Sequence, residues 1–298
     1  MREYLKRKYY LSRTLVSLVA EVEAQKDYSK LQASIRRSGV ERHRIKTVNS
    51  LRDRYSDEIH KTCHILASGA SVLESSRNLD SKRDFIVGFN YAGFLPVPFD
   101  VYFIETATTT GVFNEHSRWH EQLYLQMCEV KQPDVFVKCL WARESWDADY
   151  INNKYGSNLS VIEDILPSFP IVAKSRVIGK CYKQFIASHA RKYFVNGASS
   201  SIFAMLFAYR IGFRNIVIHG LDFKGPHFYH SDVATAGSLL KDVRLSTPLV
   251  VDTHFHSASM WMAIELPRVL SMLDGQGVAV YSASDSSMFS TYAPVFPM

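Results

Sequence analysis

A run of small residues, Ser68, Gly69, Ala70 and Ser71, follows an apolar segment that is typical of a buried strand. Small residues between a strand and a helix allow backbone N–H groups to approach a phosphate closely. The run is not G-x-G-x-x-G and contains no Walker lysine, so it does not favour NAD or ATP. Two interpretations stay open: a phosphate-binding turn, or a tight strand-to-helix turn without a ligand.

Polar residues end the next two predicted strands as well. Asn90 follows the second strand, and Glu105 stands at the end of the third. The carboxyl ends of parallel strands form one edge of a sheet, and ligands bind in the crevice outside that edge. We therefore expect Asn90 and Glu105 to lie at the same crevice as the turn at 68–71.

Three consecutive serines, Ser199, Ser200 and Ser201, precede an apolar helical segment. One serine is enough to cap a helix, and the exposed N–H groups of a helix N-terminus can hold an anion. The surplus hydroxyls favour contact with a ligand over capping alone.

Asp222 comes just after a short buried strand and close to Gly220. A carboxylate at the end of a strand is a candidate for catalysis or for binding a ribose. The alternative is a cap on the following turn. Residues 223–256 are rich in Gly, Pro, His, Ser and Asp and interrupt the alternation of strands and helices, so we predict a lid over the crevice.

Asp252, His254 and His256 form a D-x-H-x-H pattern that is found in metal-dependent amidohydrolases. That pattern normally opens a barrel, whereas only 42 residues follow His256. We expect no metal site here, and we regard Asp147-Ala148-Asp149 as a solvated face. His256 is instead predicted to begin a helix, where the dipole favours the neutral imidazole that a general base needs.

The elements that would position these residues alternate along the chain. Continuous apolar strands that alternate with helices indicate a parallel sheet covered on both faces, that is, an α/β, Rossmann-like, mostly parallel fold. The predicted strands are 63–67, 85–89, 101–104, 135–140, 216–218 and 278–281, and the predicted helices are 115–130, 146–155, 179–192, 201–211 and 257–273.

Residues 1–60 form a separate basic arm in this interpretation. They hold 14 Lys and Arg against 8 Asp and Glu, whereas residues 61–298 hold 21 of each. Apolar residues recur at helical spacing and no proline occurs, so we predict a helical arm followed by one Rossmann-like domain over 61–298, including the lid at 223–256. The arm either packs on the domain or lies on an anionic membrane surface through residues 1–25.

The neutral charge balance of the domain argues against a dedicated nucleic-acid groove, which would carry a basic stripe. No segment has the length and hydropathy of a membrane span or a signal peptide, so we expect a cytoplasmic protein, with peripheral contact to the inner face of the membrane as an option. The four cysteines lack C-x-x-C spacing and are expected to be free thiols.

Taken together, these segments resemble the bacterial sialyltransferases of glycosyltransferase family 42, which use CMP-sialic acid. I-L-A-S-G-A-S-V-L is similar to the first-strand turn of that family, and F-I-V-G-F-N to its second strand. The longest match is S-S-S-I-F-A-M-L-F-A-Y-R-I-G-F-R-N-I-V-I-H-G-L-D-F. H-S-A-S-M-W-M-A-I-E-L resembles the segment that carries the catalytic histidine. The resemblance covers 61–298 and leaves 1–60 without a counterpart.

The resemblance implies a metal-independent glycosyltransferase without a bound cofactor, which moves sialic acid or a related keto-sugar, such as Kdo, from CMP to a glycan or lipo-oligosaccharide acceptor. His256 would be the general base. Tyr229 and Lys224, in the lid, would face the leaving phosphate, and Asp222 would be the nucleophile if the reaction were retaining. Contacts with CMP would come from Ser68, Gly69, Ser71, Asn90 and Ser200.

The sequence also departs from the family pattern. Ser68 replaces an asparagine, Ala70 a proline, and Glu105 stands where an amide is common. These departures leave the identity of the donor sugar open. Two other classes stay open too: a relative of the flagellin-modifying glycosyltransferases or of an archaeal pterin pyrophosphokinase, and a non-catalytic nucleotide-binding module. A homo-oligomer is compatible with each.

Overall fold

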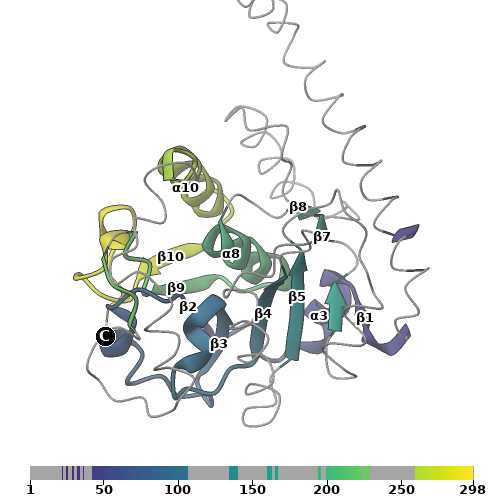
Figure 1. Cartoon of the computed structure of the whole chain (residues 1–298), viewed down its shortest axis with the longest axis horizontal. Coiled ribbons are helices and arrows are strands. Elements are labelled where there is room, and N and C mark those ends of the chain that lie inside the picture. Colours follow the sequence, from purple (N-terminus) through teal and green to yellow (C-terminus); the bar gives the residue numbers. More distant parts are fainter. Residues whose placement is uncertain are drawn as a thin grey trace, which may run out of the picture.

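The centre of the protein is an eight-stranded sheet in which every strand pair is parallel (Figure 1). The order of strands across it is β1-β6-β5-β4-β3-β2-β9-β10, and β7 and β8 pair separately. This computed structural model describes residues 22, 25, 29, 32–33, 36, 42–106, 134–139, 160–162, 165–166, 194–195, 199–223, 225–228 and 259–297.

The strands of the large sheet are β1 (Ile45–Lys46), β2 (Thr62–Leu66), β3 (Asp84–Phe89), β4 (Val101–Thr106), β5 (Asp134–Cys139), β6 (Ser160–Ile162), β9 (Asn215–His219) and β10 (Ala279–Ser282). The small pair consists of β7 (Ile165–Leu166) and β8 (Phe194–Val195). The described helices are α3 (Val48–Arg54), α4 (Val72–Ser75), α8 (Ser200–Ile211) and α10 (Ser259–Asp274), with 3-10 turns η1 (Arg42–Arg44), η2 (Asn90–Phe94) and η5 (Met288–Thr291).

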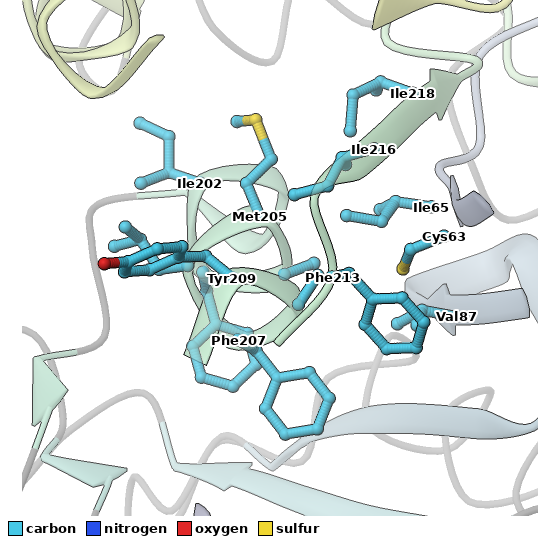
Figure 2. Packing of buried hydrophobic residues seen from close by; sticks show 14 of the residues in the cluster. Cys63, Ile65, Val87, Ile202, Met205, Phe207, Tyr209, Phe213, Ile216 and Ile218 are labelled. Carbon is cyan, nitrogen blue, oxygen red and sulfur yellow. The ribbon is translucent and has the colours of Figure 1, made fainter. Parts of the chain in front are cut away.

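Helix α8 lies on one face of the sheet and forms the centre of the core. Residues 201–211 are all buried, because the sheet covers one side of the helix while α3 and α10 contact it as well. A helix that is apolar all round is stable only when it is covered in this way. Figure 2 shows how side chains from α8 and from neighbouring strands fill this core, among them Phe207, Met205, Ile65, Cys63 and Ile216.

The opposite face of β2 and β9 is more polar. Side chains alternate along a strand, so His64 and Leu66 of β2 point away from α8, whereas Cys63 and Ile65 point towards it. His219, the last residue of β9, is level with Leu66 and shares its face. Helix α4 and the C-terminal segment cover this face, because Ser75 contacts His219 and Phe296 contacts His64.

The predicted α/β fold with a parallel, Rossmann-like sheet is confirmed. The strands at 62–66, 84–89, 101–106, 134–139, 215–219 and 279–282 begin and end within two residues of the predicted positions. Four short strands, β1, β6, β7 and β8, were not predicted, since two or three residues are too few to show a pattern. The predicted helices 115–130, 146–155 and 179–192 lie outside the described residues.

The prediction of a helical arm over 1–60 is wrong for Ile45–Lys46. Ile45–Lys46 is a strand that pairs with β6, and α3 packs on α8 through Val48 and Leu51, which are both in the core. Thr47 caps α3 by accepting a hydrogen bond from the Ser50 N–H, and the Ser50 hydroxyl oxygen accepts one from the Thr47 N–H, so a capping box fixes where the helix begins. Residues 45–54 therefore pack as part of the sheet domain.

Helical residues before this point include Val22 and Gln25. Among the helices that the structure describes, none combines the length and the hydropathy that crossing a bilayer requires.

Candidate functional site

The order of the strands reverses at β2, which lies between β3 and β9. From β2 the sheet continues through β3, β4 and β5 on one side, and through β9 and β10 on the other. In open parallel sheets the ligand crevice lies outside the carboxyl ends of the strands at such a reversal. The segments that leave these ends are residues 67–71, here called the β2 turn, and residues 220–223, here called the β9 turn.

The β2 turn and the β9 turn are joined by backbone hydrogen bonds. The Ala67 N–H donates to the His219 carbonyl oxygen, and the Gly69 N–H donates to the Gly220 carbonyl oxygen, both at 2.9 Å. The ladder between β2 and β9 thus continues past the sheet edge. The two turns form one hydrogen-bonded unit at the predicted crevice.

Glycine is required in both turns for this close approach. A Cβ on Gly69 would lie 2.6 Å from the Gly220 carbonyl oxygen and would overlap the Asp222 carboxylate. Gly220 has a φ of +66° and faces the Val72 side chain, so a side chain there would be strained as well as crowded.

We predict that Gly69→Ala lowers the free energy of unfolding by about 1–3 kcal/mol, as overpacking in a tight contact does. Denaturation by urea measures the change. Gly275→Ala is the matched control, because a Cβ there would make only ordinary contact, 3.4 Å from the Ser271 carbonyl oxygen. Equal stability of the two variants would show that the two turns separate easily.

Asp222 is bonded to the β2 turn through both carboxylate oxygens. The Ser71 N–H donates to Oδ2 at 2.9 Å, and the Ser71 hydroxyl donates to Oδ1 at 2.6 Å. The Asp222 carboxylate thus stabilises the turn before α4 rather than its own following turn, and catalysis or ribose binding by Asp222 stays a prediction. Each carboxylate oxygen keeps acceptor capacity for a further donor, such as a ribose hydroxyl.

His227 lies against Ser68 and was not identified as a site residue from the sequence. Its Nδ1 is 3.1 Å from the Ser68 hydroxyl oxygen, and the Phe228 N–H donates to the Ser68 carbonyl oxygen at 3.0 Å. The Tyr91 ring contacts the imidazole edge-on. The only signal in the sequence was a histidine after a Gly-Pro pair, five residues beyond Asp222.

The three serines at the start of α8 are partly used by the helix itself. Ser199 is the N-cap and accepts a hydrogen bond from the Ser201 N–H at 3.3 Å. The hydroxyls of Ser199 and Ser201 lie 2.6 Å apart and are both buried, while Ser200 is half-buried. Only residues 212–214 connect the C-terminus of α8 with the amino end of β9, so the N-terminus of α8 is directed towards the carboxyl ends of the strands, where the β2 turn lies.

The remaining predicted site residues are described in part or not at all. Asn90 begins η2 directly after β3, the strand next to β2, and Glu105 lies opposite Lys138 in β4, one strand further from β2; the side chains of Asn90 and Glu105 are outside the description. Lys224, Tyr229 and His256 lie outside the described residues. Helix α10 begins at Ser259, three residues after His256.

Below the β2 turn, β2 and β9 carry a buried pair of histidines. Nδ1 of His64 lies 2.8 Å from Nε2 of His219, and the two side chains are almost inaccessible, with 6% and 2% of their surface exposed. At the ends of the pair, His64 Nε2 is 3.4 Å from Asp84 Oδ1, and His219 Nδ1 is 3.0 Å from the Ser75 hydroxyl oxygen. The signal in the sequence was one histidine within each of two apolar strands.

Burial determines the pKa values of this pair. Burial lowers the pKa of His64, and the nearby Asp84 carboxylate offsets this effect only in part. Burial also lowers the pKa of His219 well below its usual range, and proximity to His64 lowers it further, while contact with the backbone of Ser75 raises it. A histidine that loses affinity for protons on folding makes the folded state less stable as the pH falls through about 6.5.

The described residues contain no group of three or more His, Cys, Asp or Glu side chains placed to hold a metal ion. Cys63 is a free thiol in the core, and burial raises its pKa. Among the described residues, the β2 turn, the β9 turn and His227 contribute hydroxyls, an imidazole and a carboxylate.

Comparison with solved structures found sialyltransferases of Campylobacter jejuni. The CstII enzyme in complex with the substrate analogue CMP-3FNeuAc is 13% identical and has a TM-score of 0.46, with 80% of this chain and 87% of that chain covered. The monofunctional α-2,3-sialyltransferase Cst-I is 17% identical and has a TM-score of 0.45, with 79% and 80% covered. No protein-family model and no curated protein matched the sequence.

Proposed function

We propose that this chain is a glycosyltransferase that uses a CMP-activated sugar, either a sialic acid or a related keto-sugar such as Kdo. The observation that carries the proposal is the bonded unit of the β2 turn and the β9 turn, where Ser71 and Asp222 meet at the reversal point of the sheet. The segments that form this unit are also those in which the sequence resembles glycosyltransferase family 42.

The geometry supports different roles for different residues, with one group facing the phosphate and another facing the ribose. The Gly69 and Ser71 N–H groups donate to protein acceptors, so we do not assign the phosphate to them. Ser68 and His227 offer a hydroxyl and an imidazole, which suit an anion. Asp222, as a carboxylate, suits the ribose hydroxyls and would repel a phosphate.

The reaction makes two demands on the protein. CMP-linked keto-sugars cleave through an oxocarbenium-like transition state, in which the departing phosphate gains charge. Groups that stabilise this charge lower the barrier, and we assign this task to His227 together with Lys224 and Tyr229 of the lid. The acceptor hydroxyl must also lose a proton, and we assign its removal to His256, just before α10.

A thermal-shift panel with CMP, CDP, UDP, GDP, ADP and NAD, each with and without magnesium, tests the proposal. A ligand that binds only the folded state raises Tm by mass action. At a ligand concentration of 100 times Kd, the free energy of unfolding increases by about 2.7 kcal/mol. We expect a shift with cytidine nucleotides that does not need magnesium. Hydrolysis of CMP-sialic acid and CMP-Kdo, assayed next, identifies the donor.

The other outcomes of the panel separate the alternatives. A shift with ADP that requires magnesium would contradict the proposal and favour a pyrophosphokinase. A shift with CMP but no turnover of any CMP-sugar would favour a nucleotide-binding module. No shift with any cytidine nucleotide would remove the donor assignment altogether.

A further inference from the structure

The His64–His219 pair forms the middle of a hydrogen-bonded run that ends at the β2 turn. Beyond His219, the Ser75 hydroxyl also lies 3.0 Å from the carbonyl oxygen of Ser71, to which it can donate. Ser71 is the residue that binds Asp222. The run Asp84–His64–His219–Ser75 therefore connects the amino end of β3 with the candidate site at the opposite edge of the sheet.

When both histidines are neutral, only one assignment of their tautomers gives every contact along the run a donor and an acceptor. Asp84 accepts hydrogen bonds, so His64 places its proton on Nε2 and leaves Nδ1 as an acceptor. His219 must then donate from Nε2, which leaves its Nδ1 as an acceptor. The single proton of the Ser75 hydroxyl is consequently directed to His219, and the Ser71 carbonyl oxygen does not receive it.

One added proton reverses this arrangement. With both nitrogens of His64 protonated, Nε2 still faces Asp84 and Nδ1 donates to His219. His219 then carries its own proton on Nδ1 and donates to the Ser75 hydroxyl oxygen. The Ser75 hydroxyl is released to donate to the Ser71 carbonyl oxygen, which also lies 3.3 Å from the Ser75 N–H.

We propose that His219, together with His64 and Asp84, is a proton-linked positioning device for the β2 turn. Uptake of one proton by the pair switches His219 from the Nε2–H to the Nδ1–H tautomer. The Ser75 hydroxyl thereby moves from His219 to Ser71, and the turn that holds Asp222 gains a hydrogen bond. The regulation of nucleotide affinity in this inference rests on the proposed function, whereas the tautomer switch does not.

The surroundings of the pair place the added charge on His64. Among the described elements packed against it, β3 contributes the Asp84 carboxylate, α4 contributes Ser75, and the C-terminal segment contributes the Phe296 ring, which contacts Tyr281 of β10. Asp84 is bound in turn by the Asp80 N–H at 2.8 Å. Burial lowers the pKa of His64 and Asp84 offsets this only in part, whereas burial and proximity to His64 lower the pKa of His219 well below its usual range.

Nitrogen NMR of the imidazole groups in the full-length protein tests the switch directly, without any nucleotide. Between about pH 8 and the lowest pH at which the protein stays folded, we expect His219 to change from the Nε2–H to the Nδ1–H tautomer as His64 gains its second proton. A single tautomer of His219 over the whole range would overturn the proposal, whatever the protein binds.

The consequence for the site is tested by the affinity for CMP at the same two pH values. The ratio of the Kd values at the two pH values is determined for the wild type and for each variant. Comparing these ratios removes the contribution from the titration of CMP itself. One additional hydrogen bond is expected to tighten binding at the lower pH by roughly 2- to 10-fold relative to the variants. Failure of CMP to bind at any pH would refute the proposed function and leave the tautomer result standing.

Two variants separate the switch from a structural role. Ser75→Ala keeps the titrating pair but removes the hydroxyl, so we expect the tautomer change to persist while the pH response of CMP affinity disappears. His64→Gln keeps a polar contact to Asp84 but cannot take up a proton, so both responses should disappear. If Ser75→Ala retained the full pH response, the connection through Ser75 would be wrong. Ser75→Ala alone decides that point, even if His64→Gln fails to fold.

Discussion

Asp222→Ala is expected to weaken CMP binding by roughly 5- to 150-fold. The substitution leaves the Ser71 N–H and the Ser71 hydroxyl without the carboxylate that accepts both at 2.9 and 2.6 Å. A partly buried donor that loses its acceptor costs about 1–3 kcal/mol. If CMP binding must restore the conformation of the β2 turn, this cost is taken from the binding free energy and corresponds to a roughly 5- to 150-fold higher Kd. Calorimetric titration with CMP measures the effect.

Asp222→Asn and Ser71→Ala are the matched controls. Asn keeps the shape, and the Ser71 hydroxyl can accept from the amide while the Ser71 N–H still donates to the amide oxygen. We therefore expect Asp222→Asn to bind CMP within a few-fold of the wild type and Ser71→Ala to fall between the two. If Asp222→Ala bound CMP as the wild type does, Asp222 would have no positioning role.

The same variant decides whether Asp222 has a second role. In a retaining reaction the carboxylate would attack the sugar, and an amide cannot replace it. Normal CMP binding with abolished transfer in Asp222→Asn would thus identify a nucleophile. Normal binding with substantial transfer would restrict Asp222 to positioning, in agreement with its two bonds to Ser71.

His256→Ala is expected to lower the rate of sugar transfer by about 10²–10⁴-fold, the usual contribution of a general base. Its Kd for CMP should change less than twofold, because the base acts on the acceptor hydroxyl and not on the nucleotide. Single-turnover transfer from CMP-sialic acid or CMP-Kdo measures the first quantity, and calorimetry the second.

His254→Ala is the control for this experiment, since it removes a histidine two residues away. A metal site of the D-x-H-x-H kind would need both histidines. If both variants lost the same fraction of the transfer rate, the assignment of His256 as the base would be contradicted and a metal site would be favoured. Normal transfer by His256→Ala would show that another group removes the proton. The pH profile of the wild type should show the titration of a single base on its acidic side.

The fold was predictable where strands are long and buried. β2, β3 and β9 contain short apolar runs that alternate with helical segments, which favours a parallel sheet, and the apolar helix α8 requires cover on both sides. The prediction failed at Ile45–Lys46, because two residues carry no periodicity and their strand character comes from pairing with β6. The contact of α3 with α8 likewise depends on residues about 150 positions apart.

The candidate site was predictable as a set of strand ends, but not in its bonding. Ser68, Gly69, Ser71 and Asp222 were selected separately, and the structure brings them together. That Ser71 uses Asp222 as its acceptor depends on side-chain geometry that no local pattern encodes. His227 was missed because it belongs to no motif, and His64 and His219 because a buried histidine is ordinarily a satisfied core residue.

The bond between Ser71 and Asp222 spans 151 positions of the chain, and the β2–β9 pairing beneath it spans a similar interval. Contacts between such distant segments close a large loop and form late, because the entropy of that loop must be overcome first. The hydrogen-bonded unit of the β2 turn and the β9 turn is thus absent from any intermediate in which β2 and β9 have not yet paired. If the chain binds CMP as proposed, the gain of CMP affinity during refolding should consequently mark completion of the sheet, and a nascent chain should be unable to bind CMP until β9 has left the ribosome.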